Sequence, residues 1–153
     1  MMAKFAGSRQ VSWMIIDDPK NYWVWVRPSK PRHTRRGREA FTEYLQHFGK
    51  WLIFSRYRAY LEELAGKLDP YVEEGKISSV KYNREPSPFA RGALVMCVYC
   101  DDREREKVWE ILNSLGVTRR IWKYDRQTLV DWRPGGRLYE KAKGAEERAR
   151  AHG

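Results

Sequence analysis

The chain has 153 residues, of which 42% are hydrophobic, so it is long and apolar enough for one domain with its own core. Its 30 Lys and Arg against 20 Asp and Glu give a net charge of +10, which favours a polyanionic partner such as RNA. No apolar run is long enough to span a bilayer, and residues 1–10 lack the apolar core of a signal peptide. We therefore expect a cytoplasmic protein with no membrane partner. A thermophile's charged surface also fits the 33% of charged residues, but it does not explain their one-sided sign.

The first part of the chain predicts two strands, a basic loop and a helix. Residues 11–16 and 22–26 are apolar and rich in β-branched and aromatic side chains, which is typical of strands. Residues 27–38 contain two prolines and a glycine among many basic side chains, so we expect a loop. This loop is either a solvated segment or an arm that contacts phosphates. Residues 39–48 have a helical apolar stripe, and Gly49 is expected to end that helix.

The middle of the chain alternates strands and helices. Residues 50–54 predict a strand, and residues 57–68 carry an apolar stripe at helical spacing. Pro70 is expected to open a short further turn. Residues 77–82 alternate like a half-buried strand, and residues 83–91 contain two prolines and predict a loop.

The last part begins with the most apolar segment. Residues 92–100 are the best candidate for a central strand, and Asp101 or Asp102 is expected to cap a helix that follows. Residues 119–124 predict another strand, and residues 138–152 form a polar segment of helical propensity.

This order predicts an α+β fold in which one sheet has about three helices packed on one face. The opposite face would then be open to a ligand. We expect a single domain over residues 1–135 and a helical C-terminal tail over residues 136–153.

Cys97 and Cys100 form a C-x-x-C pair, but both lie within a predicted strand. Alternate strand residues point to alternate faces, so Cys97 and Cys100 are expected to face opposite sides of the sheet. No second C-x-x-C pair is present and the histidines are scattered. We therefore predict buried or half-buried cysteines, no metal site and no cofactor.

Three lysines lie inside strands that are otherwise apolar or aromatic: Lys50, Lys81 and Lys123. If the strands are neighbours, the three ammonium groups converge on one phosphate-binding patch. In the alternative, each lies on the solvent face of its own strand. Further residues are candidates for the same ligand site: Arg84, Arg91, Arg126 and Thr128.

Seven tryptophans are present, and each alone is more often a core residue than a ligand contact. Trp23 and Trp25 point to the same face of one strand, and Trp132 lies in a loop with basic neighbours. Aromatic rings beside cations are typical of sites that stack bases and hold phosphates. We therefore name Trp23, Trp25 and Trp132 as candidate stacking residues.

Signals of catalysis are weak. The sequence contains no P-loop, no G-x-G-x-x-G and no H-E-x-x-H motif. His33, His47 and His152 have no carboxylate or nucleophile at a recognisable spacing. We expect a binding protein rather than an enzyme.

Four segments carry a family resemblance: residues 49–54, Lys81, residues 95–102 and residues 122–128. With them the chain resembles the basophilic leukaemia expressed protein family, a domain of unknown function. That family is similar in fold to the cap-binding translation initiation factor 4E. The resemblance implies a curved, mainly antiparallel sheet with helices on its convex back and a concave face open to a nucleotide-like ligand.

The triplet Lys50-Trp51-Leu52 is also similar to the Lys-aromatic-His triplet of bacterial phosphothreonine lyases. In those enzymes the histidine acts as an acid, but this chain has a leucine at that position. The resemblance implies Lys81 as the candidate general base.

Our first hypothesis is therefore a non-catalytic protein that binds RNA or a nucleotide. The alternatives are a phosphothreonine-lyase-like enzyme and a phosphate-recognising interaction domain for a ribosomal or phosphorylated protein.

Overall fold

The computed structural model of the chain describes residues 15–16, 22–28, 38–86, 92–131 and 133–152. The fold is α+β, as predicted, and its centre is a six-stranded sheet in which every pairing is antiparallel. The spatial strand order is β1-β2-β4-β5-β3-β6. The strands have the following bounds: β1 Ile15–Ile16, β2 Trp23–Val26, β3 Phe48–Ser55, β4 Ser79–Asn83, β5 Leu94–Asp101 and β6 Trp122–Tyr124.

Strand β5 lies inside the sheet between β4 and β3, which confirms the expectation of a central strand over residues 92–100. Its pairing with β3 extends from Phe48↔Asp101 to Ser55↔Leu94 without a break. Strand β6 is shorter than expected and pairs with only the first half of β3.

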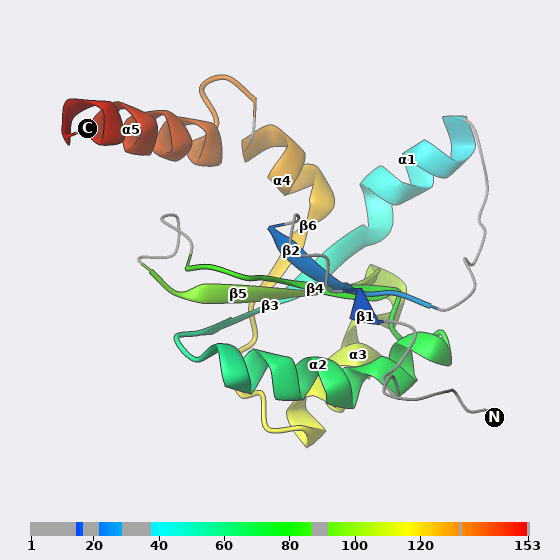
Figure 1. The fold of residues 1–153 in the computed structure, drawn as a ribbon. Helices are drawn as coiled ribbons and strands as arrows, with labels where there is room; N and C mark the ends of the chain where they lie inside the picture. The colour runs from blue at the N-terminus through cyan, green and yellow to red at the C-terminus, as the bar shows by residue number, and fades with distance from the viewer. Residues whose placement is uncertain (1–14, 17–21, 29–37, 87–91, 132, 153) are drawn as a thin grey trace.

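The helices lie on both sides of this sheet (Figure 1). Helices α2 and α3 cover one face, whereas α1 and α4 lie on the other side and contact β3 and β6. Helix α5 extends away from the sheet (Figure 1). The helices have the following bounds: α1 Arg38–His47, α2 Arg58–Glu73, η3 Asp102–Glu104, α3 Arg105–Ser114, α4 Asp125–Asp131 and α5 Arg137–His152. The second face is therefore covered at its β3–β6 end, and less of it is open than we expected.

The core lies between the sheet and helices α2 and α3. Leu61, Leu64 and Leu68 of α2 are buried there, as the apolar stripe predicted, and so are Val108 and Leu112 of α3. Cys100 belongs to this core, whereas Cys97 lies opposite Lys81 on the other face. Both cysteines are buried and unpaired, as expected. No described helix is long and apolar enough to cross a membrane.

Two local expectations were wrong. Pro70 does not open a new turn, because α2 continues through it to Glu73. Proline normally disfavours a helix interior, but Val72 is fully buried and its packing holds the last turn against the core. Gly49 does not end α1 as a C-cap glycine: the helix ends at His47 and Gly49 lies within β3.

The chain needs glycine at position 49 for a different reason. A Cβ atom there would lie 2.9 Å from the carbonyl oxygen of Lys123 and closer still to Cζ2 of Trp122. The absent side chain lets β6 and its indole pack against β3. Helix α4, which follows β6 directly, was not predicted; it is only seven residues long and has no clear apolar stripe.

Candidate functional site

One face of the sheet carries all three strand lysines. In antiparallel pairs, residues directly opposite each other point to the same face. Lys50 stands opposite Tyr99 of β5 on one side and Lys123 of β6 on the other. Lys81 of β4 stands opposite Cys97, two residues from Tyr99 and therefore on the same face. We call this surface the lysine face and define it by these residues: Trp23, Trp25, Phe48, Lys50, Lys81, Cys97, Tyr99 and Lys123.

Lys50 is buried and fully engaged within the chain. Its side chain is only 8% exposed, and its Nζ donates to Oδ1 of Asp125 at 2.7 Å and to Oγ1 of Thr128 at 2.8 Å. The hydroxyl of Tyr44 donates to the other oxygen of Asp125 at 2.8 Å. Burial and this hydrogen bond raise the pKa of Tyr44, so the phenol stays protonated and donates. Because a buried charge needs such partners, Lys50 holds α1 and α4 on the sheet.

Lys123 is also neutralised by a carboxylate of α4. Its Nζ lies 2.7 Å from Oδ2 of Asp131, and Arg137 approaches the same oxygen at 3.5 Å. The hydrogen bond from Lys123 holds the pKa of Asp131 below its usual value. Two of the three strand lysines therefore have an internal counter-ion.

Lys81 has different surroundings, because aromatic rings take the place of a carboxylate. Its Nζ lies 4.0 Å from the ring centroid of Trp23, 5.2 Å from that of Trp25 and 5.9 Å from that of Tyr99. Within the described part of the chain, Lys81 forms no ion pair. Trp23, Trp25 and Lys81 are all partly exposed, so this part of the lysine face is in contact with solvent.

The protonation of Lys81 reflects these surroundings. Burial lowers its pKa, and the positive charges of Lys50 and Arg27 lower it further, whereas Cys97 and Asp125 act in the opposite direction. A half-buried amine with a lowered pKa is the kind of group that clusters at functional sites.

The floor beside Lys81 consists of groups that stay neutral. Burial raises the pKa of Cys97 and of Tyr99, so the thiol and the phenol remain protonated. The ring of Tyr99 lies nearly parallel to that of Trp25 at 6.2 Å and to that of Phe48 at 6.0 Å. These three rings form a row across the sheet, and the Nζ of Lys50 lies 5.5 Å from the Tyr99 ring. The lysine face thus combines flat apolar rings with one amine that has no anionic partner among the described residues.

The other predicted site residues are only partly brought together. Arg84 follows β4, and its backbone N–H donates to the carbonyl of Tyr22. Arg126 turns toward the C-terminal carbonyls of α1, donating to Gln46 at 2.8 Å and to Leu45 at 3.2 Å. Thr128 of α4 is linked to the lysine face by the hydrogen bond that it accepts from Lys50. The candidates Arg91 and Trp132 lie outside the described residues, and so do residues 29–37 of the predicted basic loop.

Lys123 and Arg126 also line a groove of about 790 Å³ at the β6 edge of the sheet. Its other lining residues come from β3, the approach to β6, helix α4 and the start of α5, and they include Leu52, Phe54 and Val130. The groove is partly apolar, but the cations at its rim already have partners in Asp131 and in the end of α1.

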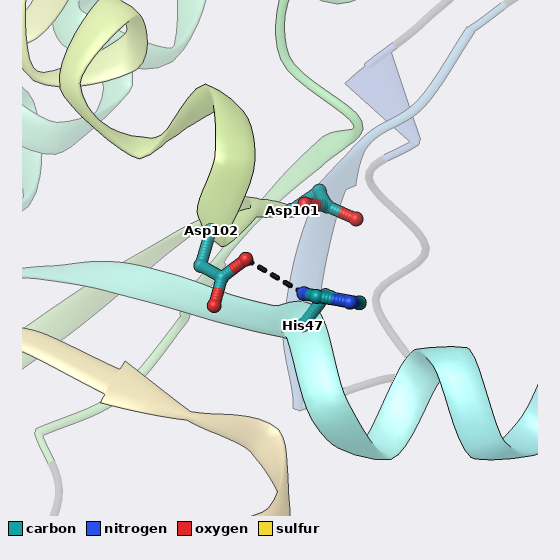
Figure 2. A group of neighbouring side chains, drawn as sticks. All are labelled: His47, Asp101 and Asp102. Carbon is teal, nitrogen blue, oxygen red and sulfur yellow. Dashed lines mark hydrogen bonds and ion pairs between the residues drawn. The ribbon is translucent and has the colours of Figure 1, made fainter.

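A cluster of His47, Asp101 and Asp102 has the residue types of a metal site (Figure 2). The nitrogen Nδ1 of His47 lies 2.9 Å from Oδ1 of Asp102, and Tyr124 donates to the other oxygen of Asp102 at 2.9 Å. The carboxylate of Asp101 accepts from the backbone N–H and from the side-chain Nε–H of Arg103. Each carboxylate therefore already has protein partners, and the cluster ties the end of α1 to the end of β5. We assign it a structural role.

Several residues that set the charge and the ring contacts of the lysine face were not predicted from the sequence. Asp125 neutralises Lys50, Tyr44 orients Asp125, Arg27 stacks on Trp25 at 4.1 Å, and Tyr99 lies beneath both lysines. A signal for Asp125 was present in the motif at residues 122–128, where it precedes Thr128 by one helical turn. Its partner Lys50 lies 75 residues away, so the sequence could not reveal the pair.

Comparison with known proteins gives no relative from which a function can be carried over. No family model, no curated protein and no solved structure matches the chain. The resemblance to the basophilic leukaemia expressed protein family and to the initiation factor 4E fold therefore stays a prediction.

Proposed function

We propose that the chain binds a nucleotide or single-stranded RNA on the lysine face, with Lys81 contacting a phosphate and the neighbouring rings contacting a base. One observation carries this proposal. Lys81 is the only lysine of this face that forms no ion pair with a described residue, while α4 supplies one aspartate each to Lys50 and Lys123. An unneutralised amine beside flat rings suits a ligand with an anionic and an aromatic part.

Arg27 adds a second cation to this site. Its guanidinium lies over the ring of Trp25, the residue that stands opposite Lys81 in the register of β2 and β4. Arginine binds phosphate through two N–H groups, whereas lysine acts as a point charge. The net charge of +10 supports the same ligand class, because it attracts polyanions over a longer range.

The division of roles among the three lysines differs from the sequence hypothesis. Lys50 and Lys123 support the face through buried or half-buried ion pairs, and the ligand contact is assigned to Lys81 and Arg27. Lys50 is mainly a positioning residue, because its charge would have to leave Asp125 to bind a ligand.

Intrinsic tryptophan fluorescence tests the proposal, with Trp23 and Trp25 as reporters. We expect a short single-stranded RNA to change the emission at low salt, with affinity falling as salt rises because phosphate contacts release counter-ions. Lys81→Met should weaken binding by about tenfold, the equivalent of roughly 1.4 kcal/mol. Lys67→Met is the matched control, because Lys67 is exposed on α2 and α2 packs on the opposite face. Equal affinity of Lys81→Met and wild type would contradict the assigned role.

The pH dependence of binding provides a second readout. The pKa of Lys81 is lowered in the free protein, and a bound phosphate favours the ammonium form. Binding should therefore take up a proton, and affinity should increase as pH falls through the lowered pKa. Calorimetry in buffers of different ionisation enthalpy measures this uptake, and it should disappear in Lys81→Met. Capture of a phosphorylated or ribosomal protein without any response to RNA would favour the interaction-domain alternative.

A further inference from the structure

The amine of Lys81 has surroundings that suit a nucleophile as well as a cation. Three aromatic rings surround its Nζ at centroid distances of 4.0, 5.2 and 5.9 Å, and they exclude water from much of its surface. The side chain is nevertheless only partly buried, so Lys81 is not sealed within the core. No described carboxylate forms an ion pair with it. Desolvation and neighbouring positive charge are the two conditions that make a lysine amine reactive near neutral pH.

The charged and titratable groups around Lys81 come from four elements of the fold. Lys50 of β3 and Arg27 at the end of β2 disfavour the ammonium form, and burial has the largest effect in the same direction. Cys97 of β5 and Asp125 of α4 favour the ammonium, and so do the faces of the tryptophan rings. Burial prevails and the pKa is lowered in sum. The opposing effects are small because the Asp125 carboxylate is already bound by Lys50 and Tyr44 and the Cys97 thiol stays protonated.

We propose that Lys81 is an imine-forming lysine that takes small planar aldehydes bearing an anionic group. The neutral amine attacks the carbonyl carbon, a C–N bond forms, and one nitrogen proton moves to the carbonyl oxygen through water. The hydroxyl group of the carbinolamine and the second nitrogen proton then leave together as one water molecule, and the C=N bond remains. The step consumes no oxidant or reductant, and it is reversible.

The preference for a planar, anionic aldehyde follows from the neighbours of Lys81. Trp23 and Trp25 are partly exposed and offer flat rings, which favour a conjugated carbonyl compound lying against them. The Arg27 guanidinium, 4.1 Å from the centroid of Trp25, supplies a cation for the anionic group. Lys50 cannot take that role while it is bound to Asp125. The reactivity itself depends on Lys81 alone, and only the anion preference shares the phosphate contact of the proposed function.

Pyridoxal 5′-phosphate is a suitable probe, because it is a planar aldehyde with a phosphate group. The full-length protein is mixed with the probe at a series of pH values, borohydride reduces any imine, and mass spectrometry of peptides gives the labelling rate at each lysine. Lys107 of α3 is the internal comparator, since its side chain is 81% exposed. At neutral pH we expect Lys81 to react faster than Lys107. The fraction of neutral amine rises about tenfold for each unit by which the pKa is lowered, while the intrinsic nucleophilicity falls by a smaller factor. The phosphate-free analogue pyridoxal should lose more of the labelling rate at Lys81 than at Lys107, a comparison that cancels the lower aldehyde content of pyridoxal.

Two results would overturn the inference: labelling of Lys81 no faster than that of Lys107, or an imine absorption band that is unchanged in Lys81→Arg. Arginine keeps the charge but stays protonated, so it forms no imine. If Lys81→Arg does not fold, the ratio of the labelling rates of Lys81 and Lys107 in the wild-type protein decides whether the inference stands. RNA titration of the same preparation separates the proposals. Labelling without RNA binding overturns only the proposed function, and RNA binding without selective labelling overturns only this inference.

Discussion

Lys50 and Asp125 lie 75 residues apart in the chain and form a buried ion pair, with Nζ and Oδ1 separated by 2.7 Å. This pair joins the sheet to α4, and through Tyr44 it also joins α4 to α1. It therefore fixes the helices that cover one end of the lysine face, while leaving Lys81 without a counter-ion of its own among the described residues.

Removing one member of this pair should destabilise the protein strongly. Asp125→Ala leaves the charge of Lys50 buried without a carboxylate, which typically costs about 3–5 kcal/mol. Urea denaturation measures the free energy of unfolding. The double variant Lys50→Met/Asp125→Ala should be more stable than Asp125→Ala alone, because it no longer contains the unpaired ammonium. A matched exposed pair is Glu63–Lys67 of α2, where Glu63→Ala should change stability by less than about 1 kcal/mol. Equal costs at the two pairs would show that Lys50 is not buried as described.

Gly49→Ala should destabilise the protein by steric conflict. The new Cβ would meet the Trp122 indole and the backbone of β6, and overpacking of this kind costs about 1–3 kcal/mol. Gly66→Ala is the matched control, since nothing lies within 4 Å of its Cβ position in α2. The free energy of unfolding of Gly66→Ala should rise by about 0.5–1 kcal/mol, because alanine loses less conformational freedom than glycine in a helix interior. Thermal unfolding of the two variants should thus shift in opposite directions, and a neutral Gly49→Ala would contradict the close packing of β6.

Asp101 should contribute stability that is lost in acid. Its carboxylate caps η3 by accepting from the backbone N–H of Arg103 at 2.8 Å, and the Arg103 side chain holds its pKa below the usual value of 3.8. The unfolded chain therefore takes up the proton first. The contribution is complete above the unfolded pKa and disappears as pH falls through the lowered folded pKa.

Asp101→Asn separates the two roles of this residue, because asparagine keeps a capping oxygen but has no charge. We expect Asp101→Ala to lower the free energy of unfolding by about 1 kcal/mol at neutral pH. Asp101→Asn should lose less than alanine, because only the exposed ion pair with Arg103 is removed. The difference in unfolding free energy between Asp101→Asn and the wild-type protein should disappear in acid, which unfolding at a series of pH values measures. A loss that persists in acid would show that the charge of Asp101 is not its source.

Several features of the fold could be predicted because their signals are local. The apolar stripe over residues 57–68 predicted a helix that packs on the core, and its Leu61, Leu64 and Leu68 are buried. The alternation of β5 predicted that Cys97 and Cys100 face opposite sides, and the register confirms it. Gly49 and Pro70 were misread because their local signals were overridden by tertiary packing, against Trp122 in one case and around Val72 in the other.

The sequence by itself determined the α+β class, the order of the strands along the chain and the placement of lysines within three of them. Periodicity and turn residues encode these properties over a few neighbouring positions. Only the tertiary structure decided which lysine has a carboxylate partner, because Asp125 and Asp131 reach the sheet through a helix that has no strong sequence signal. The character of Lys81 was decided in the same way. Its amine is surrounded by rings from β2 and β5, which the antiparallel register brings to β4 from distant parts of the chain.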